Sequence, residues 1–313
     1  MIARRYSVSH YTTYDYSAEM LDGYSVANLL ARSTPTQRVL STELTTDPDV
    51  DERDDRIDVF GNKVVQLGIH RPHHQLVVAV STQVEITSAM TPRTNPAWEQ
   101  AAAQTAALRS GLSLDVSPFL ASSRLVPVRS SSPESAALIA AFTNEFAPGR
   151  PILDVIADVC SSIFTDYRFD PTATMVTTPL SVVVAQRAGV CQDFAHLAVG
   201  AFRAHGLAAR YVSGYIETDP PPGEEKTIGA DASHAWCSVW IPEHGWVDLD
   251  PTNGIVGVDR HVTVGWGRDY ADVAPIRGVV IGPTSTQTLS VSVDVARLSS
   301  VSSSDLIKTQ PTC

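Results

Sequence analysis

Alternation of polar and apolar residues dominates the first part of the chain. In the opening stretch YSVSHYTTYDY, Tyr6, Val8 and His10 fall on one face of an extended strand, with serines between them. A period of two with aromatic and β-branched residues is typical of half-buried strands. The same pattern returns in RVLSTELTTDP, RIDVFGNKVVQLGI and QLVVAVSTQVEI. Residues 1–90 are therefore predicted to form an antiparallel β-domain.

The pattern changes twice after that domain. Residues 91–132 are rich in Pro, Ser, Thr and Ala and are interpreted as a connecting segment. From Pro133 apolar residues recur at helical spacing, with Ser132 as a candidate N-cap. Three predicted helices precede the predicted strands ARYVSGYIE, HAWCSVWI and GWVDLDPT. We assign residues 133–298 to a second domain, including a late strand in TLSVSVDVARL, and expect a mobile tail over 299–313.

Composition places the chain among globular proteins. Of its 313 residues, 43% are hydrophobic and 18% are charged, which is enough to build a core. The net charge of -11 disfavours binding to nucleic-acid phosphates. We identify no secretory signal and no apolar stretch long enough to span a membrane. Four widely spaced cysteines without a CxxC pair indicate free thiols, as in a cytoplasmic protein.

One cysteine is placed where a nucleophile would be effective. Cys191, in GVCQDFAH, opens a predicted helix with one apolar stripe: Phe194, Leu197, Ala198, Ala201 and Phe202. The free N–H groups and the positive dipole end of a helix N-terminus stabilise a thiolate. A single cysteine on an apolar face is more often a packing residue, so the assignment depends on a base and a carboxylate elsewhere.

Strand parity selects candidates for that base and carboxylate. In HAWCSVWI, His234 faces the same way as Trp236, while Cys237 faces the opposite way and is interpreted as core. In the next strand Asp248 and Asp250 share one face. Either aspartate is suited by this criterion to orient the imidazole of His234.

Three segments together resemble the transglutaminase-like superfamily: RAGVCQDFAHLAVGAFRAHGLAARYVSGY, SHAWCSVW and GWVDLDPTNG. In that family the catalytic cysteine opens a helix, the histidine lies in an H-A-W strand, and the aspartate precedes P-T or a similar pair. The resemblance implies these roles for Cys191, His234 and Asp250, and it selects Asp250 over Asp248. HYTTYDY, DVFGN and HVTVGWGRDYADVAPIRGV resemble the bacterial branch. The implied fold is α+β: a papain-like core, with the cysteine helix packed on an antiparallel sheet, preceded by an antiparallel β-domain.

Other residues near these motifs are weaker candidates. Tyr167, in DYRFDP, is a candidate second oxyanion donor beside the Cys191 N–H. Asp193, in the first helical turn, either balances the helix dipole or shapes the mouth of the site. His196 points about 140° away from Cys191 and is interpreted as a packing residue. The segments HRPHH and DVDERDD are interpreted as a loop and a solvated charge run, so neither a metal nor a cofactor is expected.

The strands carrying His234 and Asp250 are joined by PEHG and are predicted to form a hairpin. For the two side chains to share a face, the residue numbers of each pair across the hairpin must add to an even value. A three-residue loop gives a sum of 486 and a five-residue loop gives 484. We predict an even register and favour 484, which places His234 directly opposite Asp250.

These residues predict thiol-dependent acyl transfer at an amide of a protein or peptide substrate. Cys191 attacks the carbonyl to form a thioester, His234 moves the protons, and Asp250 holds the imidazole. The acceptor is an amine in a transglutaminase, or water in a cysteine peptidase or amidase, and both remain open. A catalytically silent binding protein is a further hypothesis, which an intact triad disfavours.

Overall fold

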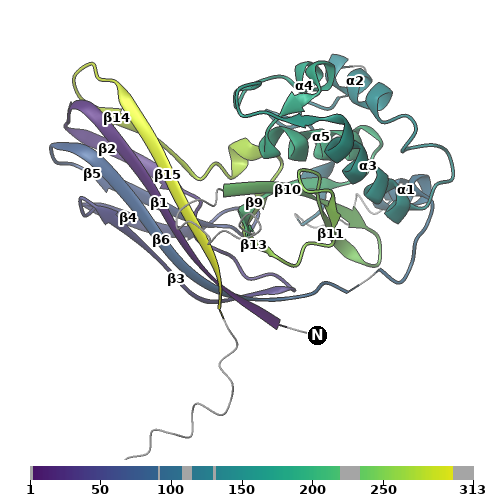
Figure 1. The fold of residues 1–313 in the computed structure, drawn as a ribbon, viewed down its shortest axis with the longest axis horizontal. Helices are drawn as coiled ribbons and strands as arrows, with labels where there is room; N and C mark the ends of the chain where they lie inside the picture. The colour runs from purple at the N-terminus through teal and green to yellow at the C-terminus, as the bar shows by residue number, and fades with distance from the viewer. Residues whose placement is uncertain (1–2, 91, 108–114, 130–131, 219–232, 299–313) are drawn as a thin grey trace, which may run out of the picture.

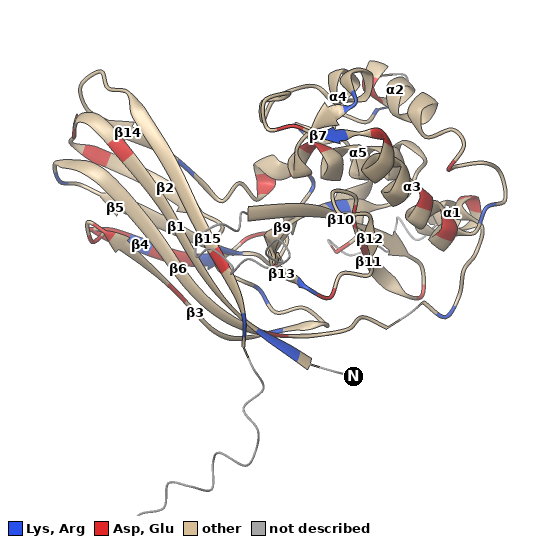
Figure 2. Cartoon of the chain, in the orientation of Figure 1, with Lys and Arg blue, Asp and Glu red and all other residues tan. Residues whose placement is uncertain are grey.

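The structure, a computed structural model, describes residues 3–90, 92–107, 115–129, 132–218 and 233–298, which form two domains (Figure 1). The tail expected over 299–313 lies outside the described residues. Within the described ranges, no helix combines the length and apolar character needed to cross a bilayer. Lysine and arginine residues are interspersed with acidic residues over both domains (Figure 2).

The first domain is built from two four-stranded antiparallel sheets, with orders β15-β1-β6-β3 and β14-β2-β5-β4. Apolar residues of both sheets share one core, including Met20, Leu44, Leu67 and Val78. The strands are β1 (Ala3–Met20), β2 (Asp22–Ala27), β3 (Gln37–Asp47), β4 (Glu52–Ile57), β5 (Lys63–Ile69), β6 (His73–Thr87), β14 (Ile276–Ile281) and β15 (Gln287–Leu298).

The alternating pattern that predicted this domain is visible in the burial of β1. Tyr6, Val8 and His10 are buried, and the serines between them are only partly buried. Because successive side chains of a strand point to opposite faces, the buried set lies on the inner side of the sheet. The prediction of an N-terminal antiparallel β-domain is confirmed.

The last two strands correct the expected domain boundary. β15 pairs with β1 from Arg5–Leu298 to Tyr16–Gln287, and β14 pairs with β2. The strand predicted in TLSVSVDVARL therefore exists, but it completes the first domain and does not belong with the core assigned to 133–298. Its alternation predicts a strand without specifying a partner, because pairing depends on contacts distant in sequence.

The second domain places helices against a five-stranded antiparallel sheet of order β12-β11-β10-β9-β13. The strands of this sheet are β9 (Ala209–Ile216), β10 (Ser233–Ile241), β11 (Gly245–Asp250), β12 (Ile255–Val256) and β13 (His261–Gly267). The helices are α1 (Trp98–Ala107), α2 (Pro133–Ala141), α3 (Ile152–Asp166), α4 (Leu180–Gln186) and α5 (Cys191–Ala204), with short 3-10 helices η2 (Ser117–Leu120) and η3 (Tyr270–Asp272). A two-stranded parallel ladder joins β7 (Arg168–Phe169) to β8 (Ala188–Gly189).

Helix α5 is the central element of this domain. It packs on β9 and β10, and α2, α3 and α4 contact its other sides. Every residue from Asp193 to Arg203 is buried, so the helix is covered on all sides beyond the predicted apolar stripe. This burial fixes the position of the first turn, where Cys191 lies.

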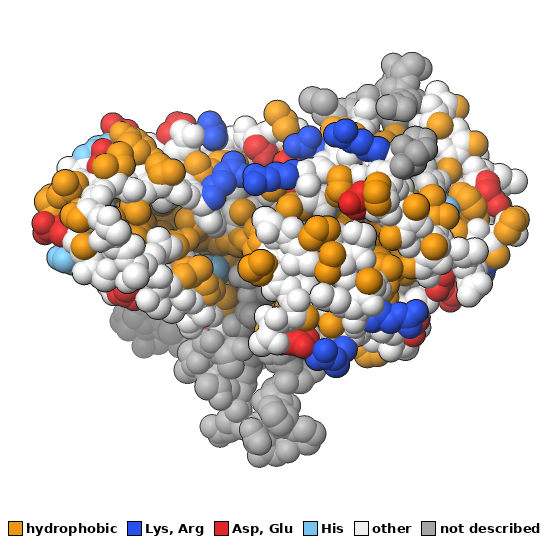
Figure 3. All heavy atoms as spheres, turned by 90° about the horizontal axis from the view of Figure 1, so that it is seen from above, with side chains coloured by type: hydrophobic (Ala, Val, Ile, Leu, Met, Phe, Trp, Pro, Cys, Tyr) orange, Lys and Arg blue, Asp and Glu red, His pale blue; other side chains and the backbone are white. Residues whose placement is uncertain are grey.

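The two domains share a set of buried residues that we call the interdomain cluster: Tyr6, Val8, Ala31, Val84, Ile86, Tyr215, Val262, Val264, Val293 and Val295. The amide of Gln37 in β3 adds two hydrogen bonds to β13, donating to the Thr263 carbonyl at 2.7 Å and accepting from the Thr263 N–H at 2.9 Å. Seen from above, the surface is hollowed between the domains, and hydrophobic side chains line the hollow (Figure 3).

Candidate active site

Cys191 is the first residue of α5, as predicted, and it is partly exposed. Asp193 Oδ2 accepts a hydrogen bond from the Val190 N–H at 2.9 Å and another from Thr174 Oγ1 at 2.6 Å. Asp193 is buried, so it holds the helix N-terminus and does not line an open mouth. A Cβ at Gly189 would lie 2.6 Å from Asp193 Oδ2, so this cap requires glycine there.

The hairpin that carries the histidine and the aspartate has the predicted even register but not the favoured one. β10 and β11 pair Ser238 with Asp248 and Ile241 with Gly245, which add to 486. The loop is therefore three residues long, and Gly245 closes it with φ 102, a conformation that glycine adopts without steric cost. The favoured register, in which paired residue numbers add to 484, was wrong.

His234 and Asp250 meet on one face of the sheet. His234 Nε2 lies 2.7 Å from Asp250 Oδ2, and the exposed fractions of the two side chains are 8% and 0%. The Thr252 N–H donates to Asp250 Oδ1 at 3.0 Å. Since Nε2 faces the carboxylate, the second ring nitrogen of His234 is available to the thiol of Cys191.

The electrostatics of this group favour a charged imidazole. Burial lowers the pKa of His234, but hydrogen bonds to Asp250 and Cys191, together with their charges, raise it to about 9. Burial raises the pKa of Asp250, and hydrogen bonds from His234 and His261 hold it well below its usual range. The arrangement therefore stabilises an imidazolium between a carboxylate and the cysteine sulfur.

Asp248, the alternative carboxylate, has a different partner. Ser238 Oγ donates a hydrogen bond to Asp248 Oδ1 across the β10–β11 ladder. No hydrogen bond joins Asp248 to His234 among the residues that the structure describes. The geometry thus agrees with the family pattern, which favoured Asp250.

Two residues that contact the Asp250 carboxylate were not predicted from the sequence. His261 Nε2 lies 2.8 Å from Asp250 Oδ2, and Asn253 Nδ2 donates to the same oxygen at 2.7 Å. Asn253 follows in DPTNG and His261 begins the quoted segment HVTVGWGRDY, so both lay in motifs already singled out. The role of His261 was not deduced because β10 and β9 separate its strand β13 from β11, so no strand pairing expected from the sequence brings His261 to Asp250. Asn253 lies in the turn that directly follows Asp250, and this nearness in sequence is the signal that would have found it.

The two tyrosines near α5 differ in their relation to the thiol. Tyr167 is buried with its ring 6.2 Å from that of Phe194, and no hydrogen bond or ring contact with Cys191 or His234 is found within the described ranges. Burial raises the pKa of Tyr211 well above its usual value, and the charge of Cys191 is the largest electrostatic contribution. Tyr211 is therefore the tyrosine electrostatically coupled to the candidate nucleophile.

The remaining cysteines and the helix histidine have structural environments. Cys237 is buried in the core, on the opposite side of its strand from His234, as predicted. The Cys160 thiol donates to the Asp250 carbonyl at 3.4 Å. His196 Nε2 accepts a hydrogen bond from the Tyr270 N–H at 3.1 Å, which confirms its interpretation as a packing residue.

One donor set has the composition of a metal site. His234, Asp250 and His261 place their donor atoms within 4.8 Å of one another. Both histidine nitrogens lie at hydrogen-bonding distance from the same Asp250 oxygen. Ligands around an ion with bonds of about 2.0 Å lie farther apart, near 3.3 Å in a tetrahedron, so this spacing suits hydrogen bonds better than coordination.

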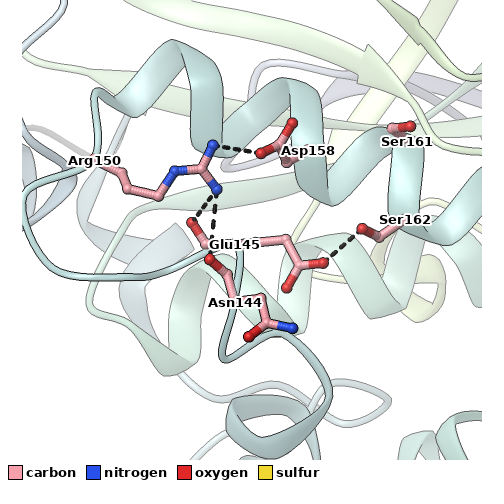
Figure 4. Close-up of a pocket in the computed structure, with 6 residues that line it drawn as sticks. All are labelled: Asn144, Glu145, Arg150, Asp158, Ser161 and Ser162. Carbon is pink, nitrogen blue, oxygen red and sulfur yellow. Dashed lines mark hydrogen bonds and ion pairs between the residues drawn. The ribbon is translucent and has the colours of Figure 1, made fainter.

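A separate polar pocket lies along α3, away from this group. Its volume is about 140 Å³, and Figure 4 shows its lining residues: Asn144, Glu145, Arg150, Asp158, Ser161 and Ser162. Arg150 forms an ion pair with Asp158, and Ser162 donates to Glu145 at 2.6 Å. These contacts connect the lining residues to one another, and none of them belongs to the candidate active site.

Both domains of the chain are similar to known proteins. Residues 140–251 match the family model of the transglutaminase-like superfamily, and residues 6–85 match that of the bacterial transglutaminase-like N-terminal region. An uncharacterized protein of Mycobacterium tuberculosis is 37% identical over 304 residues, which cover 93% of this chain and 92% of the relative. An uncharacterized protein of Mycobacterium leprae is 31% identical, covering 94% of this chain and 99% of the relative.

Two further matches are to proteins whose names refer to an activity. Over 87 residues the chain is 33% identical to a protein-glutamine gamma-glutamyltransferase of Pseudomonas aeruginosa, covering 28% of this chain and 13% of that protein. A crystal structure from Cytophaga hutchinsonii, described as a candidate cysteine protease, aligns with a TM-score of 0.71. The alignment covers 96% of this chain and 92% of the Cytophaga chain at 21% identity, which shows a similarity of fold.

Proposed function

Because the chain belongs to the transglutaminase-like superfamily, with the bacterial N-terminal region, we propose that Cys191, His234 and Asp250 catalyse acyl transfer at an amide. The observation that carries the proposal is the 2.7 Å contact of His234 Nε2 with the buried Asp250 carboxylate, with Cys191 as the other partner of the ring. The substrate is a protein or peptide that presents an amide as acyl donor.

The proposed reaction has two halves. The Cys191 thiolate attacks the amide carbonyl, and a carbon–sulfur bond forms while the carbon–nitrogen bond breaks. His234 gives its proton to the departing amine or ammonia. The neutral imidazole then takes a proton from an amine or water, which attacks the thioester and releases the sulfur. Asp250 stays ionised and stabilises the imidazolium of each half.

The oxyanion of the tetrahedral intermediate needs donors beside the sulfur. The Cys191 N–H is one, because the first N–H groups of a helix have no intrahelical acceptor. We assign the second to the Tyr211 hydroxyl in preference to Tyr167. The assignment is supported by the pKa of Tyr211, which is raised by burial and by the charge of Cys191, whereas the contacts of Tyr167 among the described residues include none with Cys191 or His234.

A glutamine-containing peptide, incubated with and without a primary amine and analysed by mass spectrometry, tests the reaction and its acceptor. A mass gain equal to the amine minus ammonia indicates transfer to an amine. Conversion of glutamine to glutamate, or loss of a terminal fragment, indicates water as acceptor in an amidase or a peptidase. The sequence relationship to a glutamyltransferase supports the first outcome.

Matched cysteine variants test the nucleophile. Cys191→Ala is expected to abolish turnover, while Cys237→Ala, at a buried core position, retains it. Turnover by Cys191→Ala would exclude the covalent mechanism. The catalytically silent alternative is tested by alkylation of Cys191 with iodoacetamide at pH 6, where an ordinary thiol with a pKa of about 8.5 reacts slowly. Slow alkylation in the native protein would favour that alternative.

A further inference from the structure

The Asp250 carboxylate is a buried charge with an unusual number of donors. Three side chains donate to its Oδ2: His234 and Asn253 at 2.7 Å and His261 at 2.8 Å. The carboxylate itself is 0% exposed. A buried carboxylate is costly unless hydrogen bonds replace the water it has lost, so each of these donors contributes to keeping it ionised.

His261 contacts the carboxylate through one of its two ring nitrogens. Its side chain is 1% exposed, and Nδ1 is buried without a hydrogen-bond partner among the described residues. An ionised carboxylate oxygen only accepts hydrogen bonds, so the 2.8 Å contact has the Nε2–H of His261 as its donor and Asp250 Oδ2 as its acceptor.

The backbone that carries His261 is held by the N-terminal domain. The next residue, Val262, is fully buried in the interdomain cluster, and its side chain points away from that of His261 by strand alternation. Gln37 pairs with both backbone polar groups of Thr263. On the other side, Arg4 forms an ion pair with Asp259. The β-domain thus holds this strand on both sides of the imidazole.

We propose that His261 is a positioning residue of the acyl-transfer site, which donates a hydrogen bond to Asp250 and keeps that carboxylate ionised and oriented toward His234. The N-terminal β-domain, through β13, fixes His261 in place. The inference rests on the proposed function for its catalytic meaning, but the contact between His261 and Asp250 has consequences that do not require turnover.

The test compares His261→Leu and His261→Gln with the native protein by carbon-13 NMR of the aspartate carboxyls, with the Asp250 signal assigned by Asp250→Asn. His261→Leu removes the donor, and the Asp250 titration is expected to move upward by about one pH unit or more, since a hydrogen bond to a charged group is lost. His261→Gln places an amide nitrogen near the former Nε2 and restores most of the shift. Alkylation of Cys191 at pH 6 should fall about tenfold in His261→Leu and recover in His261→Gln.

His10→Leu is the matched control. His10 is also buried at the domain interface, where it hydrogen-bonds to Tyr215, and no hydrogen bond to Asp250 is found in the described part of the chain. Both readouts should match the native protein in this variant. An unchanged Asp250 titration in His261→Leu, or an equal shift in His10→Leu, overturns the proposal.

Two further results remain decisive. If His261→Leu does not fold, His261→Gln is compared with His261→Asn, whose shorter side chain does not bring its amide to the Nε2 position. Equal Asp250 titrations in that pair would overturn the proposal. If native Cys191 is not alkylated at pH 6, the proposed function fails, while the Asp250 titration still decides the role of His261.

Discussion

Asp248 and Asp250 lie two residues apart on β11 and have different partners. Asp250 contacts His234, and Asp248 accepts from Ser238. We therefore expect Asp250→Asn to lower kcat by about 10⁴-fold, the loss known for a triad aspartate in a serine protease. Asp248→Asn should lower it only a few-fold. Amine incorporation into a glutamine peptide measures both, and equal losses would show that the carboxylate has been misassigned.

The tyrosine assignment gives a second matched pair. Tyr211→Phe removes the hydroxyl assigned to the oxyanion, and we expect kcat to fall about 10²-fold, in the range for loss of one oxyanion donor. Tyr167→Phe, a change of the same size at a buried ring packed on Phe194, should leave kcat near the native value. A larger loss of kcat in Tyr167→Phe than in Tyr211→Phe would assign the second oxyanion donor to Tyr167.

His234 links the site to the pH dependence of stability. Its pKa is raised from 6.5 to about 9 in the folded chain, so its contribution is full below pH 6.5 and is lost as pH rises through 9. At about 1.4 kcal/mol per pH unit, the free energy of unfolding should fall by up to about 3 kcal/mol over this window. Urea titrations of the native protein and His234→Gln measure it, and the variant should lack the fall.

At this scale the sequence and the family resemblance predicted that Cys191 opens a helix and that His234 and Asp250 come together, because each residue occupies a fixed place in a short motif. Their catalytic roles are the proposal that the variants above test. The sequence did not predict His261 or Asn253 as partners of Asp250. His261 lies on β13, which pairs with β9 and is separated from β11 by two strands, yet its imidazole reaches Asp250. No local pattern encodes that contact.

Among the secondary-structure elements, the start of α5 depends on a side-chain cap. Asp193→Ala removes the acceptor of the Val190 N–H, and we expect a loss of about 1 kcal/mol in the free energy of unfolding. Glu134→Ala is the control, because Glu134 lies in the first turn of α2, where Ser132 provides the cap. Urea denaturation measures both, and equal effects would show that the cap contributes nothing specific.

The β10–β11 hairpin shows where prediction from an element stops. Strand parity required an even register, and the structure confirms it. The choice between the registers with sums of 484 and 486 depended on the length of the turn. The expectation that His234 lies directly opposite Asp250 led to the wrong register. In the observed register the two side chains meet diagonally, within reach for long side chains on neighbouring strands.

In the whole molecule, the domain interface should affect the chemistry of the site. Gln37→Leu removes both hydrogen bonds to Thr263, and we expect a lower Tm and slower alkylation of Cys191 at pH 6. Gln75→Leu is the control, since Gln75 is exposed on β6 and its side chain donates to Asp15, away from the domain interface. Slower alkylation in both variants, or in neither, would argue against a specific coupling through β13.

The domain arrangement was only partly predictable. The change of hydrophobic period along the chain predicted a β-domain followed by a segment of helices and strands, and the resemblance to the family implied how that second segment folds. The structure confirms an N-terminal β-domain followed by helices packed on an antiparallel sheet. The return of β14 and β15 to the first domain does not follow, because a strand pattern names no partner. The pairing of β15 with β1 joins segments more than 270 residues apart.

That pairing sets an order of events during synthesis. The ribosome emits β1 first and β15 last, so the first sheet lacks an edge strand while the helical core is being made. The core, whose contacts are closer in sequence, is able to condense before the β-domain is complete. Until then β1 presents an unpaired edge on which another chain could form a ladder. A nascent chain stalled before residue 287 should therefore recruit chaperones more strongly than one released after residue 298.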